Sequence, residues 1–492
     1  MHAALLLACA ALAAHGAHAQ VERRLGNFRE VFAWKQMTFN INGQTLLRDR
    51  FGSDGLEEDS RQKRQTDEVV FNNHEEEPER NWNQNSGSSW IRPQRQMTYL
   101  NRFTSRPDSN TGPISTSTTT RPTSPNDEAG RFFIQYNNVP MGMERVGNRL
   151  FVSLPRRRHG IPTTLNYINL DRESNTRSPA LTPYPDLRQG RRLTSVYRTR
   201  ADQCGRLWMV DTGLMEIPNN PQQAQPPAIV VFDLATDTEI LRYPFKSTDV
   251  PAANTPTGLA SITVDVINGD CSNTFAYVPD LTTFGIIVFS LRERDSWRLQ
   301  HNYFSFNPTA GNLNIAGHRF QWSDGIFSIT LNDPDPSGCR TAYFHPLIST
   351  EEFSVNTCVL RNRTASSDSD YFQRYSVVGN RGENSQCTMH GYHSASSVIF
   401  FADIGRNAVS CWKTSNILNP GNVAVLAQDS TRMSYPSDLH VTDDEVWVMA
   451  NTLPRFGYSR LDPNQYNFYI YRGNVNDLIT GTVCDGRTSF AG

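Results

Sequence analysis

The chain has 492 residues, with 47 lysines and arginines against 49 aspartates and glutamates, and its formal net charge is −2. A balance this close to neutral creates no overall electrostatic field that would attract nucleic acid or an anionic membrane, so any binding depends on a local site. The length allows about two to four domains or one large β domain.

The first residues carry the pattern of a secretory signal peptide. An apolar run from Ala3 to Ala14 is followed by Ala17-His18-Ala19, which matches the small-residue pattern of a cleavage site. We therefore expect residues 1–19 to be removed and the protein to be secreted and extracellular. A membrane anchor is the alternative, but the run is shorter than the ~20 apolar residues that span a bilayer, and no later segment is long and apolar enough.

The cysteines fit an oxidising compartment. Seven of them follow the signal segment, and none forms a CxxC pair, which argues against zinc or thioredoxin-type chemistry. We expect disulfides, and the odd number leaves at least one thiol free or paired between chains. Asn362-Arg363-Thr364 is an N-glycosylation sequon in a polar stretch, so Asn362 is a predicted glycosylation site.

Two segments precede the main domain. Residues 20–51 contain one predicted strand, Phe32–Ile41. Residues 52–130 combine acidic runs with a stretch rich in Ser, Thr and Pro, and such a composition buries too little apolar surface to order, so we expect disorder. This insertion includes the dibasic sequence Arg61–Arg64; processing after Arg64 is one interpretation, and an ordinary solvated charge run is the other.

Residues 131–492 contain short apolar runs between turn residues, without long helical periodicity. Strands are predicted at Leu193–Tyr197, Ile229–Leu234, Ile262–Ile267 and Ile286–Leu291. One pattern, an apolar strand that ends in a polar or proline break, occurs six times, at Leu150–Pro155, Leu207–Asp211, Phe275–Asp280, Ala342–Pro346, Ile399–Asp403 and Val446–Asn451. The spacing predicts an all-β, six-bladed β-propeller with a central channel, because each four-stranded blade needs neighbours to bury its faces. The lone strand at Phe32–Ile41 would pair with the last blade and close the ring; an open β-sandwich fits six repeats poorly.

The breaks at the ends of the repeats are candidate ligand contacts, because they should lie at similar heights around the channel. They are Pro155, Asp211, Asp280, His345, Asp403 and Asn451. Such a ring of carboxylates, imidazole and amide would suit a protonated amine or catechol hydroxyls. The alternative is structural: Asp211-Thr212-Gly213 and Asp403-Ile404-Gly405 are D-x-G turns, in which the aspartate bonds its own backbone.

Several blocks resemble the insect Yellow / major royal jelly family. They are Val139–Gly142, Arg149–Arg156, Gly160–Leu165, Pro183–Pro185, Cys204–Gly213, Ala402–Gly405 and Tyr435–Leu439, in the order that the family has them. The resemblance covers Phe32 to about Asn42 and then Phe132 to the C-terminus, whereas the insertion departs from the usual short connection. It implies a six-bladed propeller, a role in cuticle pigmentation and the melanin pathway, and an extracellular partner such as cuticle or extracellular matrix.

The resemblance also implies a ligand class, a small catechol- or indole-type amine, with no cofactor, no nucleic acid and no membrane. Amine-binding members carry a channel asparagine in the block of Asn451, followed two residues later by an aromatic ring where this chain has Leu453. The loss of that ring would weaken attraction to an amine. Tyr435 and Pro436 precede the same strand and are expected to line the same side, as is Asp211 on its own blade.

Some members convert dopachrome, a reaction that takes a proton from carbon and delivers one to oxygen. His393, Asp403 or Asp280 is a candidate base for it. His390 and His393 are three residues apart, which would suit metal on a helix, but the stretch precedes a strand and lacks an HExxH context, so no metal is predicted. Trp208, Phe400 and Trp447 are expected in the core.

Three functions therefore compete. The first is a secreted pigmentation protein that binds a small molecule in its channel, and the second is a dopachrome-converting tautomerase. The third is a calcium-dependent lactonase, since Asp211, Asp403 and Asn451 resemble the metal ligands of other six-bladed propellers, although the Yellow-type blocks argue against it. No GxSxG, P-loop or Rossmann pattern is present.

Overall fold

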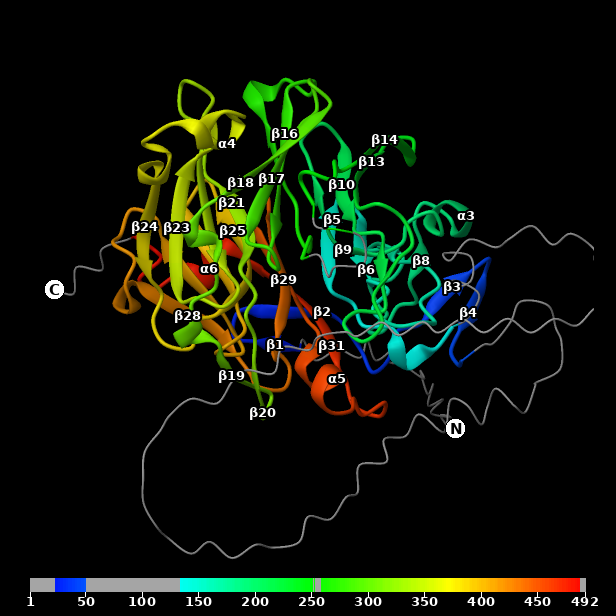
Figure 1. Cartoon of the computed structure of the whole chain (residues 1–492). Helices are drawn as coiled ribbons and strands as arrows, with labels where there is room; N and C mark the ends of the chain where they lie inside the picture. Colours follow the sequence, from blue (N-terminus) through cyan, green and yellow to red (C-terminus); the bar gives the residue numbers. More distant parts are fainter. Residues whose placement is uncertain (1–22, 50–132, 251, 253–257, 487–492) are drawn as a thin grey trace, which may run out of the picture. The chain divides into compact units, whose positions relative to one another are not determined.

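The computed structural model describes residues 23–49, 133–250, 252 and 258–486. The predicted signal segment, the insertion 52–130 with its Arg64 site, and the chain's last residues lie outside the described residues. The described part is built from five four-stranded sheets and one five-stranded sheet, each antiparallel, with three small two-stranded hairpins between them. Figure 1 shows the strands of these sheets arranged as the blades of a propeller.

One strand of each large sheet contacts the corresponding strand of the next sheet, and the last contacts the first, so these six strands surround the axis. The innermost strands are β5 (Gly142–Val146), β9 (Val196–Ala201), β15 (Thr263–Val266), β21 (Ile326–Leu331), β25 (Cys387–His393) and β29 (Pro436–Thr442). This closed ring confirms the predicted six-bladed β-propeller and excludes the open sandwich.

The six sequence repeats are the second strands of the six blades. These are β6 (Arg149–Ser153), β10 (Arg206–Asp211), β16 (Thr274–Asp280), β22 (Thr341–Pro346), β26 (Val398–Asp403) and β30 (Glu445–Ala450). The third strands are β7 (Leu165–Asn169), β13 (Ala228–Asp233), β17 (Gly285–Ser290), β23 (Glu351–Asn356), β27 (Ala408–Lys413) and β31 (Phe468–Asn474). The second strands are buried on both faces, which explains why their apolar runs dominate the sequence pattern.

The outer strands are shorter or more polar, and the sixth blade takes its outer strands from the N-terminus. They are β8 (Thr182–Pro183), β14 (Thr238–Pro244), β18 (Asp295–Gln300), β24 (Tyr375–Asn380), β28 (Val423–Gln428), and β2 (Phe28–Trp34) with β1 (Arg24–Leu25). In Figure 1 the blue β2 runs beside the red β31, to which it is hydrogen-bonded. The strand expected over Phe32–Ile41 is in fact two: β2 begins earlier, and β3 (Phe39–Ile41) forms a separate hairpin with β4 (Gln44–Leu46).

The remaining elements lie in loops. Besides short 3-10 helical turns, they are the hairpins β11 (Leu214–Met215) with β12 (Gln222–Gln223) and β19 (Asn312–Ile315) with β20 (His318–Gln321), and the short helices α3 (Leu187–Gly190), α4 (Thr357–Arg361), α5 (Leu453–Tyr458) and α6 (Val475–Ile479). Within the described residues, none of the helices combines the length and the apolar composition needed to cross a bilayer. Trp208, Phe400 and Trp447 are buried in the blades, as expected for core residues.

Three disulfides join segments of the propeller. Cys204–Cys271 connects the loops of the second and third blades, Cys339–Cys358 lies within the fourth, and Cys411–Cys484 ties the fifth blade to the C-terminal segment. Cys387, on the innermost strand of the fifth blade, is a buried free thiol. The expectation of disulfides with one unpaired cysteine is confirmed for the described residues.

Candidate functional site

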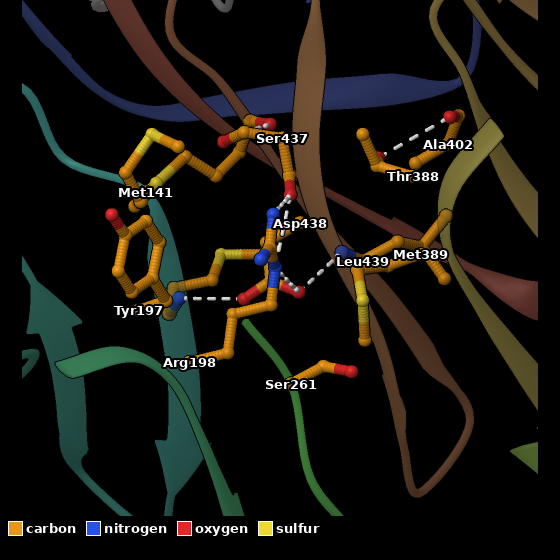
Figure 2. A network of polar contacts seen from close by, with 12 residues as sticks. Met141, Tyr197, Arg198, Ser261, Thr388, Met389, Ala402, Ser437, Asp438 and Leu439 are labelled. Carbon is orange, nitrogen blue, oxygen red and sulfur yellow. Dashed lines mark hydrogen bonds and ion pairs between the residues drawn. The ribbon is translucent and has the colours of Figure 1, made fainter. Parts of the chain in front are cut away.

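Charged side chains from several innermost strands meet in the interior of the ring. Asp438 on β29 is fully buried, accepts the backbone N–H of Met143 on β5 at 2.8 Å, and lies 3.6 Å from Nε of Arg198 on β9. Arg198 donates to the carbonyl of Ser437 at 3.2 Å and to that of Ala260, before the third blade, at 2.8 Å. Figure 2 shows the guanidinium of Arg198 beside β29, with dashed lines to Ser437 and Asp438. This buried pair therefore joins four blades.

His440 extends the same network along β29. Its Nε2 is 3.1 Å from both carboxylate oxygens of Asp438, and its Nδ1 is 2.5 Å from Oε2 of Glu144 on β5. Burial and the guanidinium of Arg200 lower the pKa of His440, but Asp438 and Glu144 raise it more, so the pKa lies above its ordinary value. The imidazole links two buried carboxylates beside Arg198 and Arg200, so the interior of the propeller here is ionic rather than apolar.

A second group of polar side chains lies where the chain enters the innermost strands. Asp324 precedes β21 of the fourth blade, Tyr435 precedes β29 of the sixth, and Arg157 follows β6 of the first. The charge of Arg157 acts on Asp324, and both charges act on Tyr435. Because the first and fourth blades are opposite each other in a ring of six, this interaction runs across the axis.

Asp324 has the properties of an acid–base group. Burial raises the pKa of its carboxyl to about 6, and Arg157 offsets only part of that rise. Among the described residues, neither the Asp324 carboxylate nor the Arg157 guanidinium has a hydrogen-bond partner. A carboxylate with a pKa near neutrality and no fixed partner is the kind of group that accepts a proton from a substrate.

Aromatic side chains stand beside Asp324. Tyr435 has a φ of +53°, a left-handed conformation that costs a non-glycine residue about 1–3 kcal/mol and is often found at binding sites. Its ring meets Trp322 edge-on, with the ring centroids 5.9 Å apart, and the Trp322 indole donates to the hydroxyl of Tyr458 at 2.6 Å. Since Trp322 and Asp324 are two residues apart, flat apolar surface and the carboxylate adjoin at the same end of the ring.

The aspartates predicted from the repeats are all buried and engaged. Asp211 accepts the backbone N–H groups of Thr194 and Ser195 at 2.9 Å and that of Gly213 at 3.2 Å, so its D-x-G turn is present. Asp280 accepts three backbone N–H groups at 3.2 Å and a contact from the Arg298 guanidinium at 3.2 Å. These two carboxylates fasten the loops that lead into their blades.

Asp403 differs from the other two. It contacts the guanidinium of Arg406 at 3.2 Å and the Arg406 backbone N–H at 3.4 Å, so its turn bond reaches three residues on rather than two. Burial raises the pKa of Asp403 to about 7, with Arg406 and Arg381 lowering it less. Its carboxyl is 1% exposed, so it stays a candidate acid–base group only for a substrate that reaches the interior.

Asn451, the preferred ligand contact, closes the ring. Its side-chain amide donates to the carbonyl of Pro140, before the first blade, at 2.8 Å, and its Oδ1 accepts the N–H of Leu453 at 3.1 Å. Asn451, Leu453 and Pro436 are all buried, and the Pro436 carbonyl accepts a bond of 2.6 Å from Thr388. The described contacts of these residues are with the protein itself, and their ligand role stays a prediction.

His393 lies far from the other predicted catalytic residues. It is the last residue of β25, paired with Val398, whereas Asp403 pairs with Cys387 at the strand's first residue. Six residue steps of a strand separate the two ends by about 20 Å. His393 contacts Asp444 at 3.1 Å and Ser396 at 2.8 Å. The structure therefore brings Asp211, Asp280, Asp403, Asn451, Tyr435 and Pro436 to one end of the propeller and His393 to the other.

Two further predictions concern the glycosylation sequon and the pair of His390 and His393. Asn362 is exposed just after α4, and its side chain accepts the backbone N–H of Thr364 at 3.1 Å, so the sequon is accessible; glycosylation itself stays a prediction. The stretch with His390 and His393 does not precede a strand but forms β25, where residues three apart face opposite sides.

Asp324 and Arg157 were missed by the sequence analysis. The repeats marked the ends of the second strands, so Asp324, in the turn before β21, and Arg157, just after the break at Pro155, were not among the candidates. The available signal was Asp324-Gly325, a turn pair that directly precedes an apolar run. Nothing in the sequence indicated that Arg157 and Asp324, 167 positions apart, come close enough for the charge of Arg157 to lower the pKa of Asp324.

The fold and the buried charges define the class of the protein, a six-bladed β-propeller with a charged interior, and comparison with known proteins gives its family. A family model described as "Major royal jelly protein" matches residues 194–484. The chain is 44% identical over 360 residues to L-dopachrome tautomerase yellow-f of Drosophila melanogaster, which covers 72% of this chain and 83% of that protein. It is 40% identical over 369 residues to Protein yellow of the same species, covering 73% of this chain and 67% of that protein.

The chain thus belongs to the major royal jelly protein family. Solved structures resemble it only in outline. Virginiamycin B lyase from Staphylococcus aureus has a TM-score of 0.36 at 11% identity, covering 68% of this chain and 95% of that one. The PQQ-bound aldose sugar dehydrogenase from Streptomyces coelicolor has a TM-score of 0.35 at 8% identity, covering 68% and 94%.

Proposed function

We propose that this protein is a secreted enzyme of the melanin pathway that isomerises L-dopachrome or a related indole quinone at the Asp324 end of the propeller axis. The observation that carries the proposal is the pair of Asp324 and Arg157, a carboxylate with a raised pKa and a guanidinium from the opposite blade. The 44% identity to a protein named L-dopachrome tautomerase supports the same substrate class.

The chemistry requires a base, an anion contact and a hydrogen-bond donor. Arg157 binds the substrate carboxylate, which brings the ring over the Asp324 side chain. Asp324 accepts the proton from carbon, and the Tyr435 hydroxyl donates a hydrogen bond to the quinone oxygen, where negative charge develops. The full isomerisation moves two carbon-bound protons to the two quinone oxygens, one in each of two successive tautomeric steps, so it consumes no oxidant, reductant or cofactor.

Secretion is part of the proposal. Its support is the signal pattern of residues 1–19 together with three disulfides, which persist in oxidising compartments. An extracellular enzyme of this kind would act where melanin forms, in cuticle or extracellular matrix.

The test is the loss of dopachrome absorbance in the presence of the purified protein, compared with buffer. Asp324→Asn should reduce the rate by at least about a hundredfold, the usual contribution of a positioned base. Arg157→Gln should mainly raise KM, since it removes binding to a part of the substrate that does not react. Asp333→Asn is the matched control, because Asp333 follows β21 by two residues, is exposed and lies at that strand's other end.

The outcomes separate the candidate functions. Acceleration that is lost in Asp324→Asn and kept in Asp333→Asn supports the proposal. Acceleration that survives in Asp324→Asn places the base elsewhere. No acceleration, with saturable binding of dopachrome or an amine in equilibrium dialysis, would make the protein a binding protein of the pigment pathway instead.

A further inference from the structure

Three buried side chains between the fourth and fifth blades form a group of metal-ligand type. His345 is on β22, Glu352 on β23 and His390 on β25, and each is at most 1% exposed. Their potential ligand atoms, one from each residue, all lie within 4.8 Å of one another. None of the three belongs to the acid–base group at Asp324, so the proposed reaction leaves them unexplained.

The distances suit a shared cation. His345 Nδ1 is 3.1 Å from Glu352 Oε2, and His390 Nε2 is 3.1 Å from Glu352 Oε1. Ligands of a tetrahedral ion at about 2.0–2.1 Å from the metal are separated by similar distances. Two imidazole nitrogens and one carboxylate oxygen are a donor set that zinc prefers.

Two of these atoms lack a hydrogen bond in spite of their burial. Neither Glu352 Oε1 nor His390 Nε2 has a hydrogen-bond partner among the described residues, although the two atoms face each other. A buried polar atom without a partner is destabilising, and native proteins rarely leave two together. A cation between them would satisfy both.

The neighbouring contacts orient both rings for metal binding. His345 Nε2 lies 3.2 Å from the carbonyl of Thr388, which only accepts, so in the tautomer with the proton on Nε2 the lone pair on Nδ1 faces the group. His390 Nδ1 lies 2.7 Å from Ser328 Oγ, which can accept its proton and leave the Nε2 lone pair facing Glu352. Metal-ligating histidines almost always donate their second nitrogen in this way.

We propose that His345, Glu352 and His390 bind one divalent transition-metal ion, with zinc the best match, that ties the fourth blade to the fifth. The guanidinium of Arg381, 2.6 Å from Glu352 Oε2, opposes the cation but holds that oxygen and leaves Oε1 as the ligand. Because the group is closed to solvent, the ion enters as the protein folds, and its role is structural rather than catalytic.

The first test is metal analysis of tag-free protein secreted into zinc-supplemented medium. About one zinc per chain is expected in the wild type and in His393→Gln, the matched control on the same strand, and none in His390→Gln. Wild-type protein without stoichiometric transition metal would overturn the proposal, and so would zinc retained in His390→Gln.

A second measurement uses only the wild-type protein, so its result does not depend on whether the variants fold. X-ray absorption at the metal edge of the wild-type protein should show two imidazole ligands and oxygen, without sulfur. Sulfur ligands, or fewer than two imidazoles, would place the ion elsewhere and refute the assignment. Dopachrome turnover is not the readout, so failure of the proposed enzymatic function leaves this result interpretable.

Discussion

The buried carboxylate Asp438 offers the sharpest test of how the propeller is held together. It accepts the N–H groups of Met143 and Leu439 at 2.8 and 2.9 Å and faces both His440 and Arg198. Asp438→Asn keeps the size of the side chain and one acceptor oxygen but removes the charge. Two buried cations then lose their shared anion, and breaking a buried pair in this way costs about 3–5 kcal/mol.

The cost should depend on pH. Since the pKa of His440 is raised in the fold, its stabilising effect is complete below the ordinary histidine pKa and is lost as pH rises through the folded value. The pKa of Asp438 is lowered: burial raises it, but His440 and Arg198 lower it more, so its effect is lost as pH falls through its folded value. The gap between variant and wild type is therefore widest in the mildly acidic range between these two titrations.

Urea unfolding followed by tryptophan fluorescence, with disulfides intact and at several pH values, measures the effect. The control is Asp443→Asn: Asp443 pairs with Arg145 at 2.9 Å, but its side chain is 78% exposed, and surface changes usually stay within about 0.5 kcal/mol. A variant at Asp438 that is as stable as the wild type, or a loss that does not change with pH, would refute this account of the network.

Three other predictions follow from the site and the ring. Because the pKa of Asp324 is about 6, the rate of dopachrome loss should rise roughly tenfold between about pH 5 and pH 7 and then level off; a flat profile argues against this base. Phe32→Ala, in the closing strand β2, should lower the unfolding free energy by about 3–5 kcal/mol. The control Ile240→Ala, at a half-exposed side chain, should lower it by about 0.5 kcal/mol or less. Equal losses would show that packing of β2 does not stabilise the closed ring. Asn451→Ala should lower the unfolding free energy by about 1–3 kcal/mol, because the hydrogen bond to Pro140 is lost, while the folded protein keeps its dopachrome turnover. Lost turnover at unchanged stability would instead show that Asn451 contacts the substrate.

The sequence by itself determined the blades. Each repeat, such as Val446–Asn451, is a strand buried on both faces, so nearly all of its residues are apolar. The apolar run and the polar break after it can therefore be recognised without knowing what the neighbouring blades contain. Even the odd cysteine count anticipated the unpaired Cys387. The closing strand was placed only approximately, since β2 begins at Phe28 and its outer position in the blade leaves a mixed burial pattern.

Only the tertiary structure decided which polar residues meet. Asp324 and Arg157 interact because opposite blades face the same axis, and His345, Glu352 and His390 converge because one blade packs on the next. The physical reason is that burial and charge, which set a pKa or create a ligand group, depend on neighbours brought together by ring closure. A linear pattern carries the period of a strand but not the geometry of the ring.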